Sequence, residues 1–225
     1  MGQSRRRGKG VNPMAKLLDV LLEEKIVAIF RGIGAQEADA AAGALIRGGI
    51  SLMEVTLNTD EALPILSRWR ELYDGQAYIG AGTVLDLKQA REAASAGAQF
   101  IISPNLDEEV VAFGAAEGIS VWPGVMTPTE IVRAWKAGAE AVKIFPMASL
   151  GHRYLQELKA PLNLIPMMAT GGVDLDNIGD YLRAGADAVG LGSKIVNLQW
   201  AREGRFDLME DRARQFAEAV RAQRS

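Results

Sequence analysis

Short apolar runs alternate with amphipathic segments along almost the whole chain. The runs are continuous and do not alternate with polar residues, which is typical of parallel strands covered by helices. Eight of them span 26–30, 52–56, 77–81, 99–103, 119–122, 140–145, 165–169 and 187–191. Helical patterns lie between and after them, at about 36–47, 61–73, 87–96, 107–117, 128–137, 151–159, 175–184 and 205–222. A further amphipathic segment, 14–24, predicts an extra helix before the first strand.

The junctions between helix and strand repeat. In five places a helical segment ends at a glycine that an apolar run follows, within 47–55, 96–104, 117–123, 137–146 and 184–192. Glycine enters the left-handed conformation without a Cβ penalty, so each of these glycines is interpreted as a helix C-cap. At the other helix ends, Asp60, Asp107 and Thr127 are expected N-cap residues, and Pro128 suits a first helical turn.

Eight evenly spaced strand–helix units predict an α/β fold, a single (β/α)8 TIM barrel with an extra N-terminal helix. A doubly wound open sheet is the alternative. The chain has 225 residues and 48% hydrophobic content, which suits one large core. No linker separates a second domain, so residues 14–225 are expected to form the barrel.

Charge and composition exclude several classes of protein. The net charge is −3, and with the basic residues of the leader 1–13 set aside, 21 basic side chains face 28 acidic ones. We therefore expect no nucleic-acid and no membrane partner, although a nucleic-acid arm is the alternative interpretation of the leader. The leader lacks the apolar segment of a secretory signal, so it is predicted to be a disordered extension of a cytoplasmic enzyme. With no cysteine and one histidine, disulfides, thiolate metal sites and multi-histidine metal sites are excluded.

Two charged residues interrupt apolar runs. Lys143 lies within Ala-Val-Lys-Ile-Phe-Pro, and Glu54 lies within Leu-Met-Glu-Val-Thr-Leu. Burying an unpaired ammonium costs several kcal/mol. A desolvated amine also loses its proton more readily and becomes a nucleophile toward carbonyl carbon. The alternatives are a lysine whose charged end reaches solvent and a structural ion pair between the two residues.

In a barrel, chemistry gathers at the C-terminal ends of the strands. Glycine-rich segments follow the last two runs there, Thr170-Gly171-Gly172-Val173 and Gly190-Leu191-Gly192-Ser193. Consecutive loops of this kind commonly bind phosphate through backbone N–H groups. A reactive amine and a phosphate site together predict a substrate with a carbonyl at one end and a phosphate at the other.

A larger set of short motifs occurs along the chain in a characteristic order and spacing. The motifs are Phe30-Arg31-Gly32, Met53-Glu54-Val55-Thr56-Leu57, Gly80-Ala81-Gly82-Thr83-Val84, Ile102-Ser103-Pro104, Lys143-Ile144-Phe145-Pro146, Thr170-Gly171-Gly172 and Gly190-Leu191-Gly192-Ser193. Over about residues 14–200 the chain resembles the class I 2-keto-3-deoxy-6-phosphogluconate (KDPG) and 4-hydroxy-2-oxoglutarate aldolases, including their 6-phosphogalactonate branch. The resemblance implies a homotrimer of (β/α)8 barrels and a lysine imine in place of any metal or other cofactor.

The resemblance also implies a role for each matching residue. Lys143 would form the Schiff base and Glu54 would be the general acid and base. The other matching residues would bind the substrate: Arg31 and Thr83 its carboxylate, Pro104 and Phe145 its apolar parts, and Gly171, Gly172, Gly192 and Ser193 its phosphate. The implied reaction cleaves the phosphorylated keto acid to pyruvate and glyceraldehyde 3-phosphate.

One departure leaves the substrate's stereochemistry open. Many gluconate-type members carry an arginine four residues after the glutamate, where this chain has Asn58. The galactonate-type members have Asn there and Pro-Asn at the positions of Pro104-Asn105, but proline at the position of Thr56. The remaining alternatives are a 4-hydroxy-2-oxoglutarate aldolase, another phosphate-binding barrel isomerase or transferase, and a non-catalytic phosphosugar sensor. His152 is expected to be a surface residue.

Overall fold

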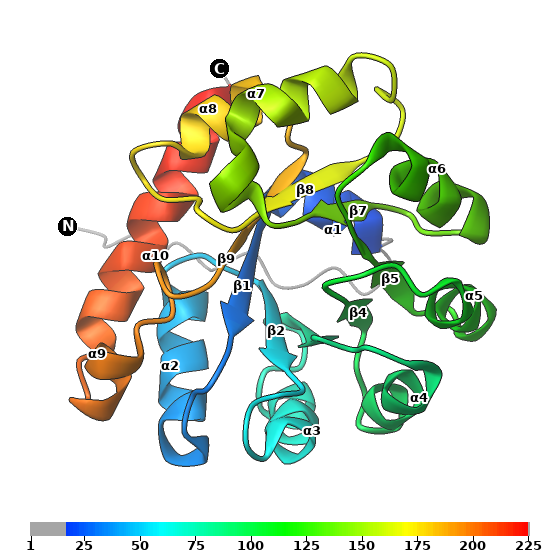
Figure 1. Ribbon diagram of the computed structural model, residues 1–225. Helices are drawn as coiled ribbons and strands as arrows, with labels where there is room; N and C mark the ends of the chain where they lie inside the picture. The colour runs from blue at the N-terminus through cyan, green and yellow to red at the C-terminus, as the bar shows by residue number, and fades with distance from the viewer. Residues whose placement is uncertain (1–16, 225) are drawn as a thin grey trace.

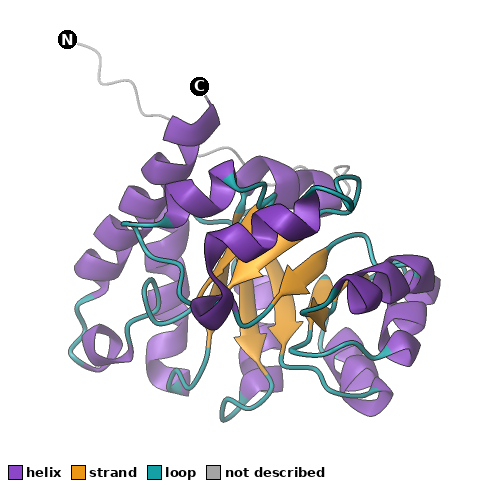
Figure 2. Cartoon of the chain, turned by 45° about the horizontal axis from the view of Figure 1, so that its top comes forward, coloured by secondary structure: helices purple, strands orange, loops and turns teal. Residues whose placement is uncertain are grey.

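Nine parallel strands form one sheet that curves around a common axis, with helices outside it (Figures 1 and 2). The computed structural model describes residues 17–224, so the expected disorder of the leader 1–13 falls outside the described residues. The strands are β1 (Ile26–Phe30), β2 (Leu52–Thr56), β3 (Tyr78–Gly82), β4 (Phe100–Ile102), β5 (Ser120–Trp122), β6 (Gly124–Val125), β7 (Val142–Ile144), β8 (Met167–Thr170) and β9 (Ala188–Leu191).

A single proline divides the strand that closes the barrel. The sheet order is β5-β4-β3-β2-β1-β9-β8-β7-β6, so its two ends are β5 and β6, which are separated in the chain only by Pro123. β5 pairs with β4, β6 pairs with β7, and the Pro123 carbonyl accepts a hydrogen bond from Lys143 N at 2.9 Å. Residues 120–125 thus complete the ring as one interrupted strand. The predicted barrel is confirmed, and the alternative of an open sheet is wrong.

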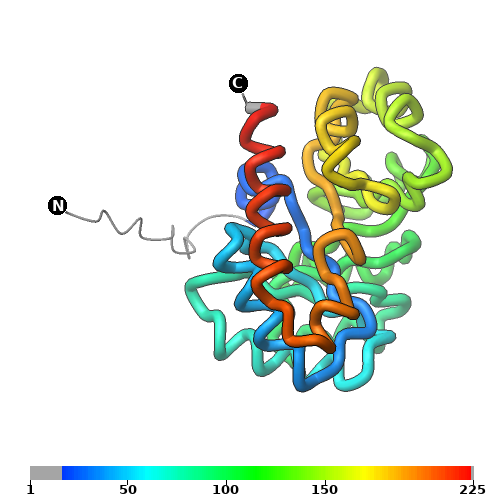
Figure 3. The backbone as a smooth tube through the Cα atoms, turned by 90° about the vertical axis from the view of Figure 1, so that its left-hand side faces the viewer, coloured from blue at the N-terminus to red at the C-terminus, as the bar shows by residue number. Residues whose placement is uncertain are grey.

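The helices follow the predicted alternation. They are α1 (Leu17–Glu24), α2 (Ala35–Arg47), α3 (Ala62–Leu72), α4 (Leu87–Ser95), α5 (Glu108–Glu117), α6 (Pro128–Ala137), α7 (Met147–Lys159), α8 (Ile178–Arg183), α9 (Leu198–Arg202), α10 (Phe206–Arg221) and the short 3₁₀ turn η1 (Ala222–Arg224). α7 begins before the predicted position 151, because a kink at Gly151 joins two helical pieces. The short α9 was not predicted. α10 packs along α2 and beside α8 (Figure 3).

The predicted capping residues are mostly confirmed. Positive φ angles occur at a glycine in each of the five repeated units, Gly49, Gly97, Gly118, Gly138 and Gly185. Gly118 and Gly138 occupy the C-cap position itself, and the other three follow the C-cap residue directly. Asp107 caps α5, and Thr127 forms a capping box with Glu130 at the start of α6. The prediction for Asp60 is wrong: Glu61 occupies the N-cap position of α3 in a left-handed conformation, and its side chain makes no capping hydrogen bond.

Buried side chains divide into an outer and an inner core. The outer core lies between the strands and the surrounding helices. The inner core fills the lumen with Val27, Leu52, Tyr78, Phe100, Ile102, Trp122, Ala141, Met168 and Ala188, and Leu21 of α1 packs against it. The extra N-terminal helix therefore covers one end of the lumen, and the loops that follow the strands surround the other. No helix within residues 17–224 is long and apolar enough to cross a membrane.

Candidate active site

Glu54 lies inside the barrel, halfway along β2. It pairs in register with Ile29 of β1 and Gly80 of β3, and its side chain is fully buried. Neither carboxylate oxygen has a hydrogen-bond partner. Buried polar atoms are nearly always hydrogen-bonded, so the unpartnered buried carboxylate makes Glu54 a candidate functional residue.

Lys143 enters the same interior from β7. It lies in register between Gly124 of β6 and Met168 of β8, and its side chain is 3% exposed. Its Nζ lies 4.9 Å from the centre of the Phe145 ring, which favours a cation there. Within residues 17–224, Lys143 and Glu54 do not approach each other within the 4.0 Å of an ion pair. The structure therefore does not support the alternative of a direct structural ion pair.

Burial moves the pKa values of these two groups toward each other. Burial raises the pKa of Glu54 to about 7, against the opposing effect of the charges on Lys143 and Arg31. Burial also lowers the pKa of Lys143; Glu54 opposes that change and Arg31 adds to it. Glu54 therefore holds a proton more readily than an ordinary carboxyl group, and a proton leaves Lys143 more easily than it leaves an ordinary lysine. A carboxyl group with this pKa both accepts and donates protons readily.

Two polar residues follow β1 and β3, the strands on either side of β2. Arg31 comes directly after β1, is exposed, and is close enough to influence both Glu54 and Lys143. Thr83 comes directly after β3 with φ of 57°, a left-handed conformation that is uncommon for a β-branched residue. Strained backbone of this kind is enriched at functional sites, where it fixes the direction of a side chain.

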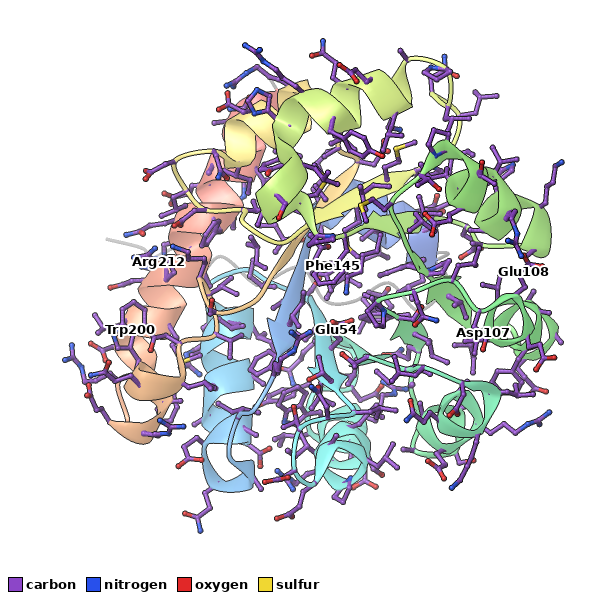
Figure 4. All side chains as sticks on the ribbon, viewed as in Figure 1. Glu54, Asp107, Glu108, Phe145, Trp200 and Arg212 are labelled. Carbon is purple, nitrogen blue, oxygen red and sulfur yellow. The ribbon has the colours of Figure 1, made fainter. Side chains whose placement is uncertain are left out.

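A cavity of about 540 Å³ opens beside Lys143 at the C-terminal ends of the strands. Seven of the residues predicted to form the site line it: Arg31, Lys143, Phe145, Gly171, Gly172, Gly192 and Ser193. Glu54 and Thr83 do not line it. Pro104 instead lines a neighbouring cavity of about 650 Å³, of which Phe145 is also a wall. Figure 4 shows Glu54 and Phe145 near the centre of the barrel.

The glycine loops form one end of this cavity. Gly171 and Gly172 have φ angles of 95° and 74°, and the Gly172 carbonyl accepts a hydrogen bond from Asn177 Nδ2 at 2.9 Å. A Cβ on Gly172 would lie 2.8 Å from Ala148 Cα, so this position has no room for a side chain. A Cβ on Gly192 would meet nothing within 4 Å. Gly172 is thus required for lack of space, whereas the backbone of Gly192 adjoins open space in the cavity.

Two lining residues with polar side chains, Thr170 and Lys194, were absent from the predicted set. Thr170, at the end of β8, is 4% exposed, and its Oγ1 has no hydrogen-bond partner. Lys194 follows Ser193 and lines the same end of the cavity. The only sequence signal for either was its position directly beside a glycine loop. Both place a polar group at the cavity wall between Lys143 and the loops.

Other residues considered from the sequence lie outside the cavity. Asn58 and Asn105 are exposed after β2 and β4. His152 is exposed on α7 with its ring centre 6.2 Å from that of Tyr181, as expected of a surface residue. Within residues 17–224, no group of three or more His, Asp or Glu side chains is arranged to hold a metal ion.

Comparisons with known proteins agree with this geometry. The family model for KDPG and KHG aldolases matches residues 17–211. The 2-dehydro-3-deoxy-6-phosphogalactonate aldolase of Escherichia coli K12 is 38% identical over 200 residues, covering 88% of this chain and 94% of that protein. A Legionella pneumophila KDPG aldolase, solved with pyruvate captured as a covalent carbinolamine, superposes with a TM-score of 0.83 at 28% identity, covering 89% of this chain and 97% of that one. A cage designed by fusing symmetric oligomeric domains matches with a TM-score of 0.82 at 35% identity, covering 89% and 74%.

Proposed function

This chain belongs to the KDPG and KHG aldolase family, and we propose that it cleaves a phosphorylated 2-keto-3-deoxy acid through an imine on Lys143. The substrate is 2-keto-3-deoxy-6-phosphogluconate or its C4 epimer, 2-keto-3-deoxy-6-phosphogalactonate, and the products are pyruvate and D-glyceraldehyde 3-phosphate. One observation carries the proposal: a buried lysine with a lowered pKa and a buried, unpartnered glutamate with a raised one share the interior of the same barrel.

The first half of the reaction captures the carbonyl. The neutral amine of Lys143 attacks C2 of the keto acid, and loss of water from the carbinolamine leaves an iminium. Because burial lowers the pKa of Lys143, more of the amine is neutral at a given pH than for a surface lysine. The iminium is the electron sink of the reaction, so the proposed mechanism includes no metal and no organic cofactor.

The second half breaks the C3–C4 bond. Ionised Glu54 takes the proton of the C4 hydroxyl through a water molecule, and the electrons of the C3–C4 bond pass into the iminium to leave an enamine. Glyceraldehyde 3-phosphate departs with C4 as its aldehyde carbon. Protonated Glu54 then returns the proton to C3, and water hydrolyses the pyruvate imine to free Lys143. A pKa of about 7 suits a group that performs both transfers at neutral pH.

The two ends of the substrate are assigned to different sets of residues around Lys143. Arg31 and Thr83, after β1 and β3, would bind the carboxylate, and Phe145 and Pro104 would cover the apolar pyruvyl carbons. The backbone of Gly171, Gly172 and Gly192, with the hydroxyl of Ser193, would bind the phosphate. The position and free hydroxyl of Thr170 suit a hydrogen bond to a hydroxyl in the middle of the substrate.

The phosphate loops also separate the candidate substrates. They favour a 6-phosphate over 4-hydroxy-2-oxoglutarate, which carries a second carboxylate and no phosphate. A phosphorylated substrate is retained inside the cell, which supports the predicted cytoplasmic location. The buried Glu54 and Lys143 favour an aldolase over an isomerase, a transferase or a non-catalytic sensor, none of which needs this pair.

The test is steady-state cleavage of both 6-phosphates, with release of pyruvate as the readout. We expect turnover of both epimers with kcat/KM values within about 100-fold of each other, because only the hydrogen bonds of one hydroxyl distinguish them. The exposed Asn58 offers no charge that would fix the carboxylate more firmly. If neither compound is cleaved, the proposal is wrong. A preference far above 100-fold would show that another side chain selects the C4 configuration.

We further infer that the chain forms the homotrimer implied by the family resemblance. Met126 and Trp135 are large apolar side chains that are 39% and 43% exposed, and the symmetric oligomeric domains of the matching cage are consistent with assembly. Light scattering at micromolar concentration should give three times the chain mass of 24.2 kDa. A mass of one chain would contradict the inference.

A further inference from the structure

The charged residues that line the 540 Å³ cavity are all cations. They are Arg31, Lys143 and Lys194, and no carboxylate among the described residues lines it. Lys143 would bind the carbonyl, Lys194 follows Ser193 at the glycine loops, and Arg31 follows β1, which pairs with β9. A substrate with a carboxylate at one end and a phosphate at the other carries negative charge at both ends. The distribution of cations therefore matches such a substrate only if Lys194 takes part.

Asp174 holds Lys194 beside the phosphate loops and also has partners other than Lys194. Its Nζ lies 2.7 Å from Asp174 Oδ2, and its side chain is 54% exposed. Asp174 Oδ1 accepts a hydrogen bond from Leu175 N at 2.8 Å and lies 3.9 Å from Arg212 Nη1 of α10. Asp174 would therefore keep two partners if the ammonium of Lys194 moved to a ligand.

Arg212 is the second cation beside Asp174 and can serve as a control for Lys194. Its guanidinium lies 5.9 Å from the ring of Trp200, and Figure 4 shows both residues on the outer helices, away from Glu54. Arg212 faces the same carboxylate as Lys194, but it does not line the cavity. The two cations thus share a partner and differ in access to a ligand.

We propose that the ammonium of Lys194 moves away from Asp174 and binds the phosphate of the substrate. This contact sets the preference of the enzyme for phosphorylated aldehydes. The proposal rests on the proposed function, because it assigns the charged partner of the phosphate that the aldolase reaction requires. The ammonium supplements the backbone N–H groups of the glycine loops with a full positive charge. Charge-assisted hydrogen bonds of this kind are about twice as strong as neutral ones.

The test is the condensation of pyruvate with glyceraldehyde 3-phosphate, run beside solvent exchange of the C3 protons of pyruvate, which needs no phosphate. Lys194→Met should raise the KM for glyceraldehyde 3-phosphate by about 10- to 100-fold, the size expected for one charge-assisted hydrogen bond. The KM for pyruvate and the exchange rate should change less than about twofold. Arg212→Met, which removes the same charge from the same carboxylate, should raise the KM for glyceraldehyde 3-phosphate by no more than about threefold.

Three outcomes would overturn the inference. An unchanged KM for glyceraldehyde 3-phosphate in Lys194→Met would show that the ammonium does not reach the phosphate. Equal losses in Lys194→Met and Arg212→Met would indicate a general electrostatic effect or damage to the Asp174 cluster. Equal losses in condensation and pyruvate exchange would indicate damage to the barrel. Failure of the wild-type protein to exchange pyruvate protons would instead contradict the proposed aldolase function itself.

Discussion

Gly82 of β3 leaves the space that the carboxylate of Glu54 occupies. A Cβ at position 82 would lie 2.5 Å from Glu54 Oε1 and 2.6 Å from its Cδ. Gly80, two residues earlier on the same face of β3, would likewise place a Cβ 2.4 Å from the ring of Phe100. The Gly-Ala-Gly motif is therefore explained by the packing of an ionisable side chain and an aromatic ring inside the barrel, without any need for unusual backbone angles.

Gly82→Ala should displace Glu54 and reduce turnover. The added methyl group overlaps the carboxylate, and such overpacking costs typically 1–3 kcal/mol in the free energy of unfolding. We expect kcat to fall by at least about tenfold, measured by pyruvate release. Gly179→Ala is the matched control, because its Cβ would meet only the ends of Arg183 and Gln223. Normal turnover in Gly82→Ala would show that the position of Glu54 does not limit the reaction.

Glu54→Gln should separate carbonyl capture from proton transfer. The amide keeps the shape of the side chain but cannot accept and return a proton. The variant should therefore still form the pyruvate imine, as detected by borohydride reduction, while exchange of the pyruvate C3 protons falls by at least about 100-fold. If exchange continues at a near-normal rate, some other group moves the proton and the role of Glu54 is wrong.

The raised pKa of Glu54 predicts how stability depends on pH. Between the ordinary pKa of 4.5 and about 7, the folded protein binds a proton at Glu54 that the unfolded chain has already released. The contribution of Glu54 to the free energy of unfolding therefore falls as pH rises through this window, by at most about 3 kcal/mol. Denaturant titrations at pH 5 and pH 8 should show a smaller decrease for Glu54→Gln than for the wild type. An identical decrease in both proteins would contradict the assigned pKa.

Gly192→Asp should selectively damage phosphate binding. A side chain here enters open space in the cavity, so the new carboxylate would repel the phosphate without straining the loop. We expect kcat/KM for the phosphorylated substrate to fall by about 100-fold or more, with pyruvate exchange nearly unchanged. Gly192→Ala is the control for size and should change kcat/KM by less than about threefold. Gly172 is a poorer site for this test, because its φ of 74° and its contact with Ala148 would add strain to any side chain.

The sequence predicted the barrel, and it named seven of the residues that line the cavity beside Lys143, because both depend on local signals. Lys143 and Glu54 interrupt apolar runs, and the glycine loops follow consecutive strands, so a parallel barrel brings them to one end. Lys194 and Thr170 could not be assigned from the pattern, since a lysine or threonine beside a loop is ordinary. Their significance depends on the cavity that both line and, for Lys194, on the contact with Asp174, which only the folded chain reveals.

The sequence also contained no sign that Thr83, assigned to the substrate carboxylate, and Pro104, assigned to the apolar wall, lie outside the 540 Å³ cavity. Thr83 and Pro104 belong to matching motifs, yet neither lines the cavity that contains Lys143. Phe145 stands between that cavity and the one lined by Pro104. A motif gives the order of residues along the strands, whereas the direction of a half-buried aromatic ring depends on packing across several strands. The N-cap prediction at Asp60 failed because Glu61 occupies the N-cap position of α3 in a left-handed conformation, which the sequence pattern did not indicate.

Reductive trapping of pyruvate tests the central claim most directly. Incubation with pyruvate and borohydride should add one pyruvyl-derived mass per chain, and peptide mapping should locate it on Lys143. Lys143→Arg keeps the charge but is too basic to form an imine, so it should abolish both the added mass and turnover. Lys159 is a useful internal comparison, because its ammonium is paired with Asp187 at 2.6 Å and should stay unmodified. The absence of any added mass, or a label on a lysine other than Lys143, would contradict the account.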